Sequence, residues 1–85
     1  MESYKITFKK SVSKDLRSIP KKDVRRILEA IKTLSENPRP PQSKKLSGQE
    51  KYRLRQGNYR ILYSIEDDKL IVQVVTVGNR RDVYR

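Results

Sequence analysis

The chain of 85 residues contains no cysteine and no histidine. Without cysteine neither a disulfide framework nor a thiolate metal site can form, so the fold must rest on packing alone. Without histidine an imidazole acid-base pair is excluded, and a catalytic metal centre has little support. The one acidic cluster, Glu66 to Asp68, falls in a predicted turn, where such residues are common for conformational reasons. We therefore expect neither a metal nor a cofactor.

Long apolar runs are also missing. No stretch approaches the roughly 20 apolar residues that a membrane span needs. The N-terminus, MESYKITFKK, lacks the apolar core of a secretion signal. We therefore expect a cytoplasmic protein with no membrane partner.

Acidic residues are scarce relative to basic ones. Ten Asp and Glu stand against 21 Lys and Arg, which gives a formal net charge of +11, far beyond what solubility requires of a small domain. A polyanionic partner is indicated. Nucleic acid is the first candidate and an acidic protein the second; an anionic membrane surface comes third, because no basic helix with an aromatic face is present. The alternative is that the charge is only a solvated surface.

Residue periodicity in the first half predicts one strand and two helices. Residues 4–9 alternate between apolar and polar, as a half-buried strand does. A short helix follows and ends at Pro20, and a second helix runs from about residue 21 to residue 36, which makes a helical hairpin. The second helix needs an apolar sheet face for its stripe, which consists of Val24, Ile27, Leu28, Ile31 and Leu34.

The second half predicts strands only. The stretch NPRPPQSKK, residues 37–45, carries three prolines, so we expect an extended connector without regular structure. Strand signals follow at residues 51–55, 59–65 and 70–77, joined by short turns into an antiparallel meander. The predicted fold is a single α+β domain over residues 1–85. It has an antiparallel or mixed sheet of roughly four strands, with both helices on one face.

The first predicted strand of the meander is unusually basic. In YRLRQGNYRILY, residues 52–63, alternation places Arg53 and Arg55 on the face opposite Leu54. Arg60 joins them if the neighbouring strand packs its tyrosines inward. Three exposed arginines would repel one another, so the cluster favours a bound anion, and losing one should leave the fold intact or firmer. The alternative is that each arginine covers a strand edge or pairs with a carboxylate from elsewhere.

Three segments carry a resemblance: KKLSG at 44–48, YRLRQGNYRILY at 52–63 and VGNRRDVYR at 77–85. In this order and spacing they resemble the RelE toxin family of the RelE/ParE superfamily. The resemblance covers essentially the whole chain. It implies a fold similar to a compact microbial ribonuclease, metal-independent cleavage of messenger RNA in the ribosomal A site, and silencing by a cognate antitoxin. It also implies contact with operator DNA only through the antitoxin complex.

The resemblance implies a catalytic set and a substrate-binding set. Cleavage through the RNA 2'-OH needs cations for the developing charge, a base and an acid. The implied catalytic residues are Arg53, Arg55, Arg60, Arg80 and Tyr84. The residues expected to bind the substrate are Lys44, Lys45, Lys51 and Arg81.

The sequence leaves open which residue acts as the general base and acid. An arginine is a poor general base, and the position of Asn79, often histidine in similar sequences, offers no imidazole. We favour Tyr84. The alternatives are a group supplied by the ribosome or one of four side chains, namely Lys45, Lys51, Glu50 and Asp82.

Two other functions remain open at this point. The ParE-like branch of the superfamily shares the fold, inhibits DNA gyrase through protein contacts and cuts nothing. The arginine set argues against it, because gyrase-directed relatives generally lack that set. The other is a catalytically inactive basic module that coats nucleic acid, which the absence of a histidine acid-base pair supports.

Overall fold

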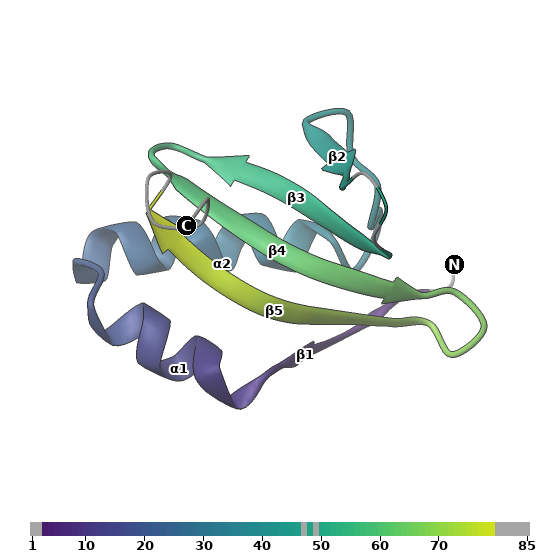
Figure 1. Ribbon diagram of the computed structural model, residues 1–85, viewed down its shortest axis with the longest axis horizontal. Coiled ribbons are helices and arrows are strands. Elements are labelled where there is room, and N and C mark those ends of the chain that lie inside the picture. The colour runs from purple at the N-terminus through teal and green to yellow at the C-terminus, as the bar shows by residue number, and fades with distance from the viewer. Residues whose placement is uncertain (1–2, 47, 49, 80–85) are drawn as a thin grey trace.

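The computed structural model describes residues 3–46, 48 and 50–79. Five strands form one sheet in the order β1-β5-β4-β3-β2, and Figure 1 shows α2 crossing behind it. The α+β prediction is confirmed. The elements in chain order are β1 (Lys5–Phe8), α1 (Lys10–Arg17), α2 (Lys21–Thr33), β2 (Ser43–Lys45), β3 (Lys51–Gln56), β4 (Tyr59–Glu66) and β5 (Ile71–Asn79).

The sheet is mixed. Strands β3, β4 and β5 form the predicted antiparallel meander, and β1 closes one side by pairing parallel with β5, with Lys5 opposite Ile71. The sheet therefore brings the first and the last of the described strands side by side.

Strand β2 corrects the expectation that residues 37–45 lack regular structure. Ser43 pairs with Leu54 of β3, so the sheet has five strands where about four were expected. The strand begins after a turn in which the Ser43 N–H donates to the Pro40 carbonyl at 2.9 Å. Pro38 and Pro40 are both buried. The prolines thus anchor the connector against the protein and deliver its end to the sheet edge.

The core lies between α2 and the sheet, as the sequence predicted. Ile27 and Ile31 of α2 are 0% and 2% exposed, because helical spacing places both on the side that faces the strands. The buried core residues are Val12, Ile27, Ile31, Leu34, Leu54, Ile61, Tyr63, Val72, Val74 and Val77.

The two helices cover different parts of the sheet. Helix α1 packs along β5, whereas α2 packs on β3 and β4, and Figure 1 shows them diverging from their short connection. Leu28, which the apolar stripe assigned to the core, is consequently 41% exposed. It lies one residue from Ile27, about 100° further round the helix, and points toward the gap between the helices. No helix among the residues described is long and apolar enough to cross a membrane.

A polar clamp ties the connector to the turn between β4 and β5. Arg39 donates to both carboxylate oxygens of Asp67, at 3.1 and 2.8 Å, and its Nε donates to the Tyr52 hydroxyl at 3.1 Å. Tyr4 adds a 2.7 Å bond from its hydroxyl to Asp67. Beneath the clamp, the Tyr63 hydroxyl donates to the Pro38 carbonyl at 2.7 Å. Four segments distant in sequence are joined here.

Replacing Ile27 by alanine should test the core. We expect Ile27→Ala to lower the free energy of unfolding by about 2 to 5 kcal/mol, since the buried side chain leaves a cavity. Leu28→Ala is the matched control and should cost clearly less, because its side chain is partly in water. Urea unfolding of both variants provides the measurement. Equal losses would contradict the placement of the core.

The clamp predicts a dependence of stability on pH. The hydrogen bonds from Arg39 hold the pKa of Asp67 at about 2, below its ordinary value near 4. A lowered pKa in the folded state means that the stabilisation is present above about pH 4 and is lost as the pH falls towards 2. The melting temperature of the wild type should therefore be higher than that of Asp67→Asn at pH 7. The difference between the two melting temperatures should disappear by about pH 2.

Asp68→Asn is the control for this prediction, because it removes the same charge from the same turn. Thermal melts of the three proteins across pH 2 to 7 provide the measurement. A gap between wild type and Asp67→Asn that is absent at pH 7, or unchanged at pH 2, would show that the clamp does not stabilise the fold.

Candidate active site

The face of the sheet turned away from the helices carries most of the predicted site. Leu54 is buried at 1% exposure, so its neighbours on β3 project from the opposite face. Cross-strand register then places Arg53 opposite Leu62 and Arg55 opposite Arg60. We call this surface the basic face and define it by Lys44, Lys51, Arg53, Arg55 and Arg60.

Strand β2 extends the basic face by one residue. Lys44 pairs with Arg53 in the antiparallel register, so both side chains project from the same face. Lys45, one residue on, lies opposite Tyr52 and therefore on the helix side. Its ammonium is 3.7 Å from the Glu50 carboxylate. The structure thus brings Lys44 to the predicted cluster and does not bring Lys45.

Arg60 shares the basic face but is 1% exposed, which corrects the expectation of three exposed arginines. It lies on the central strand, flanked by Arg55 on β3 and by Gly78 on β5, so neighbouring strands occupy both sides. Arg55 is exposed and Arg53 half-buried. The face therefore offers two accessible arginines and, on the neighbouring strand, a buried third.

Acidic residues are nearly absent from the sheet. Glu66 is the only Asp or Glu in the five strands, and it lies at the end of β4, where its carboxylate is 3.7 Å from the Lys69 ammonium. No carboxylate of β2 or β3 can offset the charge of the basic face. Within the described residues, the strands of the basic face thus carry an excess of positive charge, which favours anion binding.

The tyrosines of the described residues do not lie on the basic face. Tyr59 and Tyr63 share the helix side with Ile61, and their hydroxyls donate to the Asp23 carboxylate at 2.9 Å and to the Pro38 carbonyl. The bond to Asp23 raises the pKa of Tyr59, and burial raises that of Tyr63. Both are consequently poor proton carriers at neutral pH.

Three of the predicted site residues lie outside the described residues: Arg80, Arg81 and Tyr84. Among the candidates for proton transfer, only Lys51 lies on the basic face within the described part of the chain. No group of three or more potential metal-ligating His, Cys, Asp or Glu side chains occurs there either.

Sequence reasoning missed two polar side chains that shape the sheet. Arg39 holds the connector to the β4–β5 turn, and Asp15 of α1 accepts a 3.2 Å bond from the Val77 N–H. Asp15 also lines a polar hollow of about 460 Å³ at the open end of β5, beside Tyr59 and Asn79. No local pattern signals either contact, because the partners lie 28 and 62 residues away in the chain.

Comparison with known proteins decides the family. A family model described as the ParE toxin of the type II toxin-antitoxin system, parDE, matches residues 6–84. The chain belongs to this toxin family. The toxin is 30% identical to the putative toxin RelE1 of Methanocaldococcus jannaschii over 86 residues, covering 96% of each chain. It is 31% identical to toxin RelG of Mycobacterium tuberculosis, covering 96% of its own chain and 97% of the relative.

Solved structures show the same fold. The toxin resembles a chain of the toxin-antitoxin complex RelBE2 from Mycobacterium tuberculosis with a TM-score of 0.82 at 27% identity, covering 92% of the toxin and 99% of that chain. The archaeal RelE-RelB complex from Pyrococcus horikoshii gives a TM-score of 0.81 at 32% identity, covering 91% and 94%. These findings confirm the RelE-like resemblance, and the protein is a toxin of a toxin-antitoxin system.

The burial of Arg60 changes the stability expected of arginine variants. Arg60→Ala should destabilise the toxin by on the order of 2 kcal/mol, because a large buried side chain is lost from the central strand. Arg55→Ala removes an exposed arginine from the facing position and should change stability little. Thermal and urea unfolding of both variants provide the measurement. An Arg60→Ala protein as stable as wild type would contradict the buried placement.

Proposed function

We propose that the toxin is a metal-independent endoribonuclease that cleaves messenger RNA in the ribosomal A site and so inhibits translation. The single observation that carries this proposal is the basic face. It places Arg53, Arg55 and Lys44 side by side on one sheet surface whose strands hold almost no acid. A phosphodiester backbone is the anion that such a surface fits. The site of action is then the cytoplasm, where ribosomes and messenger meet.

The proposed reaction uses the substrate's own nucleophile. The 2'-oxygen forms a bond to the adjacent phosphorus while the bond from phosphorus to the 5'-oxygen breaks. A base takes the proton from the 2'-OH, and an acid donates a proton to the departing 5'-oxygen. The products are a 2',3'-cyclic phosphate and a 5'-hydroxyl. Negative charge grows on the phosphoryl oxygens in the transition state, and fixed cations stabilise that charge.

Exposure assigns different roles to the cations. Arg53 and Arg55 are accessible and suited to hydrogen bonding with the phosphoryl oxygens, since guanidinium groups bind them in a bidentate manner. Lys44 and Lys51 lie beside them and would hold the flanking backbone. Arg60, the cross-strand neighbour of Arg55, would act as a buried positive charge beside it. The resemblance adds Arg80, Arg81 and Tyr84 to this proposal, with Tyr84 as the proton carrier.

We expect the toxin to depend on the ribosome, because the basic face has few side chains that can transfer a proton. Lys51 is the one described candidate there for moving a proton, so the toxin gains most from a host that holds the RNA in reactive geometry. Positioning alone can supply a large part of a rate enhancement. We therefore expect slow or absent cleavage of free RNA.

A cognate antitoxin is the proposed protein partner. The solved structures similar to the toxin include complexes described as RelBE2 and as archaeal RelE-RelB. A charge of +11 favours an antitoxin segment that is acidic and also buries apolar surface. Contact with operator DNA would occur only within the complex.

A second candidate function is inhibition of DNA gyrase without cleavage. The observation in its favour is the family model itself, which is described as a ParE toxin. A non-cleaving basic module that coats nucleic acid is a third. Both are separated from the proposed function by whether messenger is cut.

The test is cleavage of messenger on programmed ribosomes by purified toxin. Arg55→Ala should slow single-turnover cleavage about a hundredfold, because one lost preorganised donor typically costs that much. Arg17→Ala removes the same charge from an exposed position of α1 on the other side of the sheet and should leave the rate unchanged. Mass spectrometry of the new ends should show a cyclic phosphate.

Each outcome discriminates between the candidates. Uncut messenger together with inhibited gyrase supercoiling would support the ParE-like function. Uncut messenger with tight RNA binding would support the coating module. If Arg55→Ala cleaves messenger at the wild-type rate, the basic face does not take part in the reaction.

A further inference from the structure

A small polar hollow lies at the edge of the sheet, between α2 and the end of β3. Its volume is about 260 Å³. Three segments supply its polar lining. These are Arg26 and Glu29 from α2, Gln42 from the connector, and Arg55 and Gln56 from β3. We call it the edge hollow.

The short length of β2 leaves this part of the sheet edge open. Ser43 pairs with Leu54, and no described residue of β2 pairs with β3 beyond that point. Within the described part of the chain, the last two residues of β3, Arg55 and Gln56, therefore have β4 as their only strand neighbour. A ligand that lies on the basic face can pass over β3 here without meeting another strand.

Arg55 connects the edge hollow to the basic face. It is exposed on the basic face, opposite Arg60 of β4, and it also lines the edge hollow. The two surfaces therefore meet at a single residue. An extended ligand that is bound at Arg55 can reach from one surface to the other.

The side chains of the edge hollow can bind a phosphate group. Arg26 and Arg55 carry guanidinium groups, which bind phosphoryl oxygens through two parallel hydrogen bonds. Gln42 and Gln56 carry amides whose NH2 groups can donate further bonds. Among the described residues of the lining, Glu29 is the one acid, and it also lines the groove on the other side of α2. The lining thus holds an excess of donors and of positive charge.

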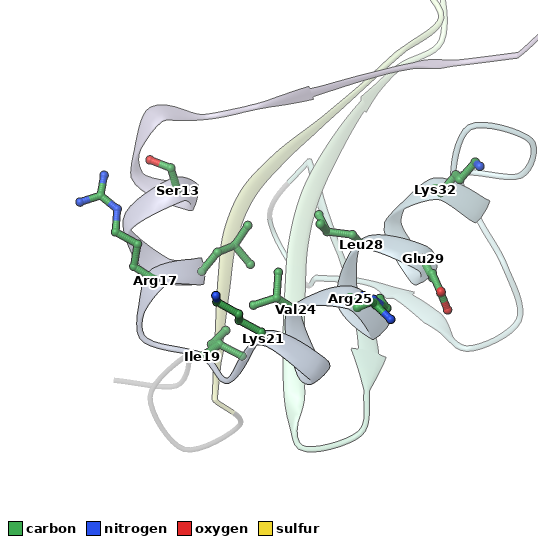
Figure 2. A pocket seen from close by; sticks show the side chains of 10 residues that line it. Ser13, Arg17, Ile19, Lys21, Val24, Arg25, Leu28, Glu29 and Lys32 are labelled. Atoms are coloured by element: carbon green, nitrogen blue, oxygen red, sulfur yellow. The ribbon is translucent and has the colours of Figure 1, made fainter.

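Helical geometry separates Arg26 from its neighbour Arg25. Consecutive helical residues lie about 100° apart, so Arg25 lines a different surface, an apolar groove of about 770 Å³ between α1 and α2. Figure 2 shows Val24 and Leu28 pointing into that groove. Arg25 and Arg26 are both exposed, and of the two only Arg26 lines the edge hollow. Arg25 is therefore a matched control for Arg26.

We propose that the edge hollow is a second phosphate subsite, which binds the backbone of the RNA strand next to the linkage held on the basic face. The inference rests on the proposed function for the identity of that strand. A nucleic acid strand fits both surfaces because it carries successive phosphates along one chain. The strand turns round the edge of β3 at Arg55, and Arg26 holds the part that has passed the edge.

The salt dependence of RNA binding tests the subsite. The probe is a single-stranded RNA of about ten nucleotides with 2'-O-methyl groups, which cannot be cleaved through a 2'-OH. Arg26→Ala should weaken binding several-fold at low salt. The slope of log K against the logarithm of the salt concentration should become shallower by about 0.7, as expected for one lost phosphate contact on a single strand. Fluorescence anisotropy provides the measurement.

Two further variants control this measurement. Arg26→Lys keeps the charge and should restore most of the slope, whereas Arg25→Ala removes the same charge from the groove between the helices and should leave the slope unchanged. Equal effects of Arg25→Ala and Arg26→Ala would show that only net charge matters, and would overturn the proposal. An Arg26-dependent affinity for a poly-glutamate peptide, without one for RNA, would assign the edge hollow to an acidic protein instead.

Shortening the RNA tests whether one strand occupies both surfaces. A dinucleotide carries a single bridging phosphate and cannot occupy the basic face and the edge hollow together. In an NMR titration, Arg55→Ala should therefore weaken its binding and Arg26→Ala should not. If Arg26→Ala weakens the dinucleotide as much as the longer RNA, the edge hollow is an independent anion site and the claim of one continuous strand fails.

Cleavage on programmed ribosomes relates the subsite to the proposed function. Arg26→Ala should raise the toxin concentration needed for half-maximal cleavage and leave the rate at saturation nearly unchanged, because a flanking contact binds substrate and transition state alike. Impaired cleavage together with normal binding of the isolated RNA would assign Arg26 to ribosomal RNA and overturn the proposal. Arg26-dependent RNA binding by a toxin that cuts no messenger would refute the proposed function and leave the subsite standing.

Discussion

The register of β4 between β3 and β5 is the constraint on which the rest of the toxin depends. It sends Ile61 and Tyr63 to the core and Arg60 to the opposite face. Because side chains alternate with a period of two, a slip of one residue would exchange the two sets. The apolar core and the basic face are therefore specified by the same hydrogen bonds, and neither can be rearranged independently.

The polar clamp links this register to the sheet edge. Arg39 and Asp67 hold the connector against the β4–β5 turn, and the connector leads directly into β2. Strand β2 in turn places Lys44 beside Arg53. A contact on one end of the molecule thus contributes to the arrangement of cations on the basic face.

The sequence predicted the periodic elements and the face on which each residue lies, but not how deeply individual residues are buried. Alternation correctly grouped Arg60 with Arg53 and Arg55, yet it could not show that Arg60 is buried, because local spacing does not reveal that β4 is the central strand of the sheet. The three-residue β2, with the sequence SKK, is too short and polar to show a period. Leu28 fitted the core stripe, but the divergence of the helices left it in the groove.

The parallel pairing of β1 with β5 has a consequence for how the toxin reaches its native state. Thr7 of β1 bonds to the Val72 carbonyl of β5 across 65 residues of chain, so the first strand made has no partner until almost the last is synthesised. Closing so long a loop is entropically costly and slows folding. A nascent chain therefore cannot complete this sheet before β5 has been synthesised, so the toxin has no native sheet until that strand is available.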